Sequence, residues 1–117
     1  NLNNGKILWQ VPLGHYENLL SEGIITGTEN YGGATATKGG LVFVAGTLDK
    51  LIRAFDADTG KELWSHELPY IGSAPPTSYE INGQQYIIIP ATGGITLKVN
   101  YMDLVELGDA FVAFKIQ

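Results

Sequence analysis

Short hydrophobic runs separated by turn residues make up most of the chain. Runs rich in β-branched and aromatic residues alternate with clusters of Gly, Asn and Asp, a pattern typical of short strands. No segment keeps a helical period over several turns, although residues 16–20 and 101–107 would each suffice for one helical turn. The sequence therefore predicts an all-β fold. The predicted strands lie near residues 7–13, 33–38, 41–46, 50–56, 62–68, 76–81, 85–91 and 110–116.

The turns between these runs have a chemical cause. The Lys-Gly-Gly run at 38–40 and the Asn-Gly pair at 82–83 supply residues that tolerate positive φ, as tight hairpin turns require. The turn at 56–60 reads Asp-Ala-Asp-Thr-Gly. We expect Asp56 to satisfy backbone donors inside that turn, rather than to act as a catalytic carboxylate.

One turn and the strand after it occur twice. Residues 3–9, Asn-Asn-Gly-Lys-Ile-Leu-Trp, align with residues 58–64, Asp-Thr-Gly-Lys-Glu-Leu-Trp, so the two tryptophans are 55 residues apart. A partial third copy sets residues 46–55 beside residues 108–114, and both end in Ala-Phe. Repeats of about 40–50 residues, four strands each, are typical of β-propeller blades.

The repeat predicts how the chain divides into blades. We expect residues 1–13 to hold the last strand of one blade, residues 33–68 a complete blade, and residues 76–117 the first three strands of the next. Trp9 and Trp64 are expected to fill the space between blades. A single four-stranded blade buries its faces poorly, so either residues 7–13 join the last three strands, or two chains share strands across open edges.

Composition and charge exclude several classes of partner and site. The seven basic residues are scattered among 12 acidic ones, and the net charge of −5 makes nucleic acid and anionic membranes poor partners. Without Cys there is no disulfide framework or thiolate metal site. No apolar run approaches the ~18 residues of a membrane span. His15 and His66 have no neighbouring ligand at metal spacing, and we assign no metal to this chain.

Residues 54–64, Ala-Phe-Asp-Ala-Asp-Thr-Gly-Lys-Glu-Leu-Trp, resemble the tryptophan docking motif of pyrroloquinoline quinone (PQQ) dehydrogenase propellers. Further segments resemble, in order, the C-terminal end of glucose-dehydrogenase-type quinoproteins. These are residues 27–33, 40–49, 68–69, 74–80 and 82–86. Residues 92–107 depart from the family, which has a Gly-rich loop there. The resemblance covers nearly the whole chain and implies a fragment of a β-propeller with about two four-stranded antiparallel blades.

The resemblance also implies a function. The parent protein would oxidise a sugar such as glucose, or an alcohol, with PQQ and a divalent cation, usually Ca²⁺, in the central funnel. It would act in the periplasm and pass electrons to a quinone or cytochrome acceptor. Most cofactor-binding groups would lie in the rest of the propeller, outside this chain, so we expect the chain alone to be inactive.

Three residues are candidates for contact with the cofactor. Asp49 matches a family position at the quinone end of the propeller, but an ordinary turn Asp that caps backbone amides explains it equally well. Asn30 lies in the Glu-Asn-Tyr-Gly-Gly run at 29–33, where paired Gly allow close approach to a ligand and Asn could donate to a carbonyl oxygen. Tyr31 would border the same site. A turn without function and simple aromatic packing are the alternatives for Asn30 and Tyr31.

Two other classes of function stay open. One is a non-catalytic propeller that scaffolds protein assembly, and the other is a free-standing β domain that binds a partner or a second copy through exposed edges. The segments at 29–33, 74–77 and 82–86 favour the enzyme, because a scaffold protein has no need to keep them.

Overall fold

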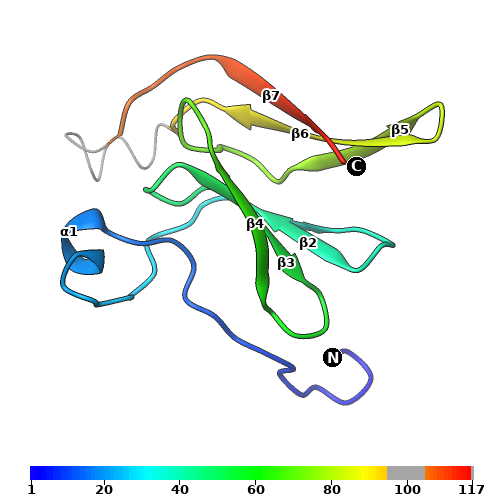
Figure 1. Cartoon of the computed structure of the whole chain (residues 1–117), viewed down its shortest axis with the longest axis horizontal. Coiled ribbons are helices and arrows are strands. Elements are labelled where there is room, and N and C mark those ends of the chain that lie inside the picture. Colours follow the sequence, from blue (N-terminus) through cyan, green and yellow to red (C-terminus); the bar gives the residue numbers. More distant parts are fainter. Residues whose placement is uncertain (95–104, 117) are drawn as a thin grey trace.

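A computed structural model describes residues 1–94 and 105–116 of the chain. These residues form two antiparallel sheets that lie face to face (Figure 1). The first sheet contains, in sequence order, β1 (Ala34–Ala36), β2 (Leu41–Val44), β3 (Leu51–Asp56) and β4 (Glu62–Glu67). The second contains β5 (Thr77–Ile81), β6 (Gln84–Ala91) and β7 (Ala110–Lys115). The all-β prediction is confirmed, and each of these strands falls on a predicted one.

The main hydrophobic core lies between the two sheets. Alternate residues of β3 and β6 point into it, because successive side chains of a strand face opposite sides of its sheet. Ile52 and Ala54 come from β3, and Ile87 and Ile89 come from β6; none of the four is more than 3% exposed. The position of these residues explains why the two sheets stack through these faces.

The predicted strand over residues 7–13 is wrong. This segment lies outside both sheets, and it does not join β5, β6 and β7 as a fourth strand. A strand needs a neighbouring edge with which to exchange backbone hydrogen bonds, but the middle of residues 7–13 is held by a side chain instead. The indole Nε1–H of Trp9 donates to the carbonyl of Ala57 at 2.8 Å, and its ring stacks on Phe55 with centroids 6.3 Å apart. The division of the chain into blades stays a prediction.

The turn between β3 and β4 receives Trp9. Gly60 has φ +71°, and a Cβ built on it would lie 2.5 Å from the Trp9 ring, so both conformation and space require glycine here. Asp56 organises the same turn, since its Oδ1 accepts hydrogen bonds from the amides of Asp58 and Thr59 at 3.1 and 2.8 Å. A hydrogen bond from the Thr59 hydroxyl to the same oxygen, together with these two amide bonds, lowers the pKa of Asp56. The local role predicted for Asp56 is confirmed.

Trp64, the second tryptophan of the repeat, lies in β4 and contacts the other sheet. Its ring meets Phe114 of β7 edge to face, with centroids 5.1 Å apart, and His66 makes a similar contact with the same Phe114. Trp64 stays 38% exposed and lines an open cavity of ≈480 Å³ with Leu41 and Leu63. Trp64 and His66 therefore extend the core to the outer edge of the first sheet.

One predicted helical turn forms. Residues 16–20 contain α1 (Glu17–Leu20), which lies outside the sheets. The other predicted turn, over 101–107, falls largely outside the described residues, and 105–107 are not helical. Among the described residues, no helix is long and apolar enough to cross a membrane.

Replacing Gly60 by alanine is expected to lower the free energy of unfolding by about 2–4 kcal/mol, through left-handed backbone strain and displacement of the Trp9 ring. Gly83→Ala is the matched control: Gly83 has φ +75°, and a Cβ there would meet nothing within 4 Å. It should cost only the strain, about 1–2 kcal/mol. Urea unfolding of the three proteins measures both losses. Equal losses would contradict the docking of Trp9 on Gly60.

Candidate functional site at the loop end of the first sheet

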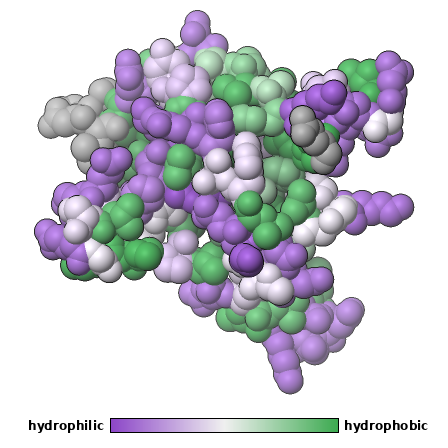
Figure 2. Space-filling model, in the orientation of Figure 1, coloured by the Kyte–Doolittle hydropathy of each residue, from purple (hydrophilic) through white to green (hydrophobic). Residues whose placement is uncertain are grey.

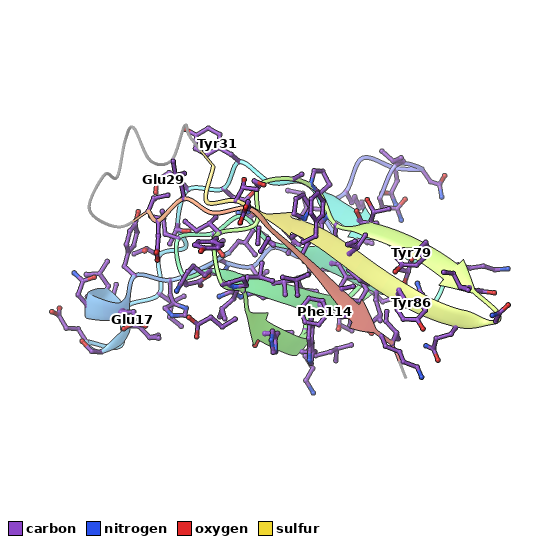
Figure 3. The ribbon with its side chains drawn as sticks, turned by 90° about the horizontal axis from the view of Figure 1, so that it is seen from above. Glu17, Glu29, Tyr31, Tyr79, Tyr86 and Phe114 are labelled. Carbon is purple, nitrogen blue, oxygen red and sulfur yellow. The ribbon has the colours of Figure 1, made fainter. Side chains whose placement is uncertain are left out.

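Two loops that carry the predicted site residues meet at one end of the first sheet. Asn30, in the segment before β1, donates through its side-chain Nδ2 to the carbonyl of Ala45, just after β2, at 2.7 Å. The hydroxyl of Thr28 accepts a hydrogen bond from the amide of Leu48 at 3.2 Å. Figure 3 shows Tyr31 beside Glu29, away from the β5–β6 hairpin that carries Tyr79 and Tyr86. The structure therefore brings the segments of Asn30, Tyr31 and Asp49 together.

The paired glycines of this end are used for packing within the chain. A Cβ on Gly32 would lie 2.5 Å from the carbonyl oxygen of Ala45, and one on Gly33 would lie 2.8 Å from the Pro75 side chain. Gly46 has φ +99°, and a Cβ there would lie 2.9 Å from the amide nitrogen of Gly32. These glycines let two loop backbones touch each other, so the close approach that they permit is to the protein itself.

Asp49 lies at the centre of a buried hydrogen-bond network. Its side chain is 2% exposed. Its Oδ1 accepts hydrogen bonds from the Thr47 hydroxyl at 2.5 Å, the Leu51 amide at 3.1 Å and Arg53 Nη1 at 3.2 Å. Its Oδ2 accepts the His15 amide at 3.0 Å, pairs with Arg53 Nη2, and lies 3.1 Å from His15 Nδ1. Both oxygens are engaged by the chain's own donors, so this carboxylate does not fit direct coordination of a cation.

Arg53 continues the network across the first sheet. It is 5% exposed although it lies in the middle of β3, and its Nε is 3.3 Å from a carboxylate oxygen of Glu62 on β4. No pattern in the sequence indicates this group of charges, because the four-residue spacing from Asp49 to Arg53 marks an ion pair only on a helix. His15, for which the sequence indicated no metal-binding neighbour, packs its imidazole against Asp49 and is 22% exposed.

The environment of Asp49 determines its ionisation. Burial raises the pKa of this carboxyl, but hydrogen bonds from Arg53, Thr47 and Leu51 and the charge of Arg53 outweigh burial, and the pKa lies below its ordinary value. A group whose folded pKa is lowered stabilises the fold above its unfolded pKa, and loses that contribution as the pH falls through the folded value. The charged form of Asp49 is therefore part of the folded structure at neutral pH.

Asp49→Asn is expected to lower the free energy of unfolding at pH 7 by about 3 kcal/mol, because the buried Arg53 loses its closest counter-charge and keeps only the partly exposed Glu62. The difference from the parent should shrink as the pH falls below about 4, where Asp49 takes up a proton in the unfolded chain, and should disappear once the folded carboxyl is protonated as well. Urea midpoints between pH 7 and pH 3 measure this, with exposed Asp58→Asn as the control. A difference that does not change with pH would contradict a role for the Asp49 charge.

The chain matches known proteins over most of its length. The family model described as "PQQ: Glucose/ethanol/alcohol dehydrogenase, beta-propeller domain" matches residues 1–87. The glycerol dehydrogenase large subunit of Gluconobacter oxydans is 47% identical over 94 residues, which is 75% of this chain and 13% of that protein. Quinoprotein glucose dehydrogenase A of Acinetobacter calcoaceticus is 32% identical over 121 residues, covering 99% of this chain and 14% of that protein.

A solved structure agrees with these matches. The quinohemoprotein alcohol dehydrogenase ADHIIG of Pseudomonas putida HK5 superposes with a TM-score of 0.57 and 27% identity, over 71% of this chain and 13% of that one. The chain thus spans only a small part of the length of each of these relatives. The family model covers well over half of the described fold, including the whole first sheet. The chain therefore belongs to the β-propeller family of PQQ-dependent glucose, ethanol and alcohol dehydrogenases.

Proposed function

We propose that this chain is part of a PQQ-dependent dehydrogenase that oxidises a glucose-like sugar or an alcohol and passes the electrons to a quinone or cytochrome. The match of the family model to residues 1–87 carries the proposal. The relatives support it, since those named above are a glycerol dehydrogenase, a quinoprotein glucose dehydrogenase and a quinohemoprotein alcohol dehydrogenase. When bound, PQQ accepts the electrons that the substrate loses.

Tyr31 is the residue of this chain that best fits contact with the cofactor. Its side chain is 59% exposed at the loop end of the first sheet. Asn30 and Asp49 fit a structural role. The side-chain nitrogen Nδ2 of Asn30 and both carboxylate oxygens of Asp49 already have hydrogen-bond partners within the chain. We assign these two residues to holding the loops that present Tyr31.

The cation of the proposed enzyme would be held elsewhere. Ca²⁺ takes six to eight oxygen ligands, many of them carboxylates, and Asp49 is committed to Arg53. Among the described residues there is no group of three His, Cys, Asp or Glu that could hold a metal. We therefore place Ca²⁺ and most PQQ contacts in the rest of the propeller, and the enzyme in the periplasm as the family resemblance implies.

The first test titrates PQQ with Ca²⁺ onto this chain and onto the longer protein of which we propose it is a part. Dye-linked oxidation of glucose, glycerol and ethanol is then measured. We expect binding and activity in the longer protein and no activity in the chain alone, because the site would be built across several blades. Failure of the longer protein to bind PQQ would reject the enzyme and favour a non-catalytic propeller scaffold.

Tyr31→Ala in the longer protein should weaken PQQ binding about tenfold, the loss expected when one aromatic contact is removed. Tyr79→Ala is the control, because Tyr79 is also exposed but lies on the β5–β6 hairpin, away from Tyr31. Fluorescence titration of PQQ gives both dissociation constants. Equal effects of the two substitutions would remove Tyr31 from the cofactor site.

We further propose that open sheet edges let the chain self-associate. Every residue of β4 and of β5 is exposed, and both strands are edges of their sheets. Light scattering should give a mass that rises with protein concentration. A monomeric mass across the range would contradict association through these edges.

A further inference from the structure

Residues 13–28 form a closed loop that contains α1 and lies to one side of the two sheets (Figure 1). The amide of Thr28 donates to the carbonyl of Leu13 at 2.8 Å, which joins the two ends of the loop. Gly27 has φ +75°, and a Cβ there would lie 3.1 Å from the same carbonyl. Compact surface loops whose ends meet in this way are frequently functional.

The tip of this loop exposes apolar side chains. Leu20, Ile24 and Ile25 are 43%, 45% and 62% exposed, and every residue from 20 to 26 is exposed. None of the three belongs to either hydrophobic core. Figure 2 shows hydrophobic surface on the α1 side of the molecule, bordered by hydrophilic surface. Apolar side chains gathered on a closed loop mark a contact surface more often than isolated ones do.

A hollow adjoins these apolar side chains. Leu20 and Ile25 line a cavity of ≈310 Å³ that also touches Val11, and Glu62 lies at the same cavity. Glu62 is 45% exposed and pairs with the buried Arg53. The loop therefore offers both a raised apolar tip and an adjoining depression, the shapes that a partner's side chains can fill.

The charge around the tip has one sign. Between Lys6 and Lys38 the sequence contains three glutamates, Glu17, Glu22 and Glu29, and no lysine or arginine. Glu17 and Glu22 are exposed and lie on either side of Leu20 in the sequence, and Figure 3 shows Glu17 at α1. Complementary charge steers protein association, so this surface fits a basic partner. It would repel an anionic membrane surface.

We propose that residues 13–28 are the docking surface for a basic electron-accepting protein. The apolar centre of that partner covers Leu20, Ile24 and Ile25, and its cationic rim faces Glu17 and Glu22. The loop lies next to the segment of Asn30 and Tyr31, so docking places the partner at the proposed cofactor end. The assignment of an electron acceptor rests on the proposed function, while the binding of a basic protein does not depend on PQQ.

The test is calorimetric titration of the 117-residue chain with a strongly basic c-type cytochrome as the probe, at about 20 mM and about 200 mM salt. We expect Ile24→Ser combined with Ile25→Ser to weaken binding about tenfold, because the apolar contact is lost. Glu17→Gln combined with Glu22→Gln should weaken it about fivefold at low salt and much less at high salt. Two control substitutions, Glu80→Gln and Leu2→Ser, change exposed residues outside the loop.

Four outcomes would overturn the proposal or a part of it. Equal effects of the loop and control substitutions would show general attraction between opposite charges. A dimer of the parent that Ile24→Ser with Ile25→Ser converts to monomer, with cytochrome binding unchanged, would show that a second copy covers the loop. Loop-dependent cytochrome binding by a longer protein that does not take up PQQ would remove the electron-acceptor role. PQQ uptake without cytochrome binding would instead reject the docking surface alone and leave the proposed enzyme standing.

Discussion

The middle of strand β3, residues 52–55, is buried throughout, and a charged residue lies inside that run. Ile52 and Ala54 face the second sheet, whereas Arg53 and Phe55 face the N-terminal part of the chain. A buried guanidinium is stable only when its charge and donors are satisfied. Asp49 and Glu62 supply those partners. This requirement links three parts of the chain: Asp49 comes from the loop before β3, Glu62 comes from the edge strand β4, and His15, at the end of residues 9–15, binds Asp49.

The same requirement gives the loop end its shape. Asp49 binds the amide and imidazole of His15, so the neutralisation of Arg53 also anchors the start of the closed loop at 13–28. Asn30 then ties the end of that segment to Ala45. Within this chain, the side chains of Asp49 and Asn30 therefore hold neighbouring loops together. These contacts fix the position of the segment that carries the exposed Tyr31.

The packing between the two sheets and the docking of Trp9 make different demands on the sequence. The two sheets stack through aliphatic side chains, which need only complementary shape and apolar character. Trp9, in contrast, needs a specific turn, because its indole donates to one carbonyl and its ring covers a glycine. The repeated Gly-Lys-x-Leu-Trp pattern thus reflects packing between a turn and a tryptophan. It identifies the family but carries no information about the reaction.

The positions of the strands in both sheets followed from the alternation of side chains and from turn residues. Glycines and asparagine with positive φ, such as Gly60 and Asn82, lie where the sequence placed turns. These are local properties, set by neighbours in the chain. The extended appearance of residues 7–13 was equally local, but a strand forms only where a distant edge is available, and that cannot be read from the segment itself.

The candidate site shows the same contrast between local properties and those that depend on distant contacts. The sequence alone determined which residue types lie at the loop end and which family they resemble. Only the tertiary structure decided that both carboxylate oxygens of Asp49 already accept hydrogen bonds. One donor is the amide of His15, 34 residues earlier, and others are the Leu51 amide and the Arg53 guanidinium, which the chain turns back toward Asp49. Whether a polar side chain is free to meet a ligand depends on how many donors reach it in space, and distance along the chain does not record that number.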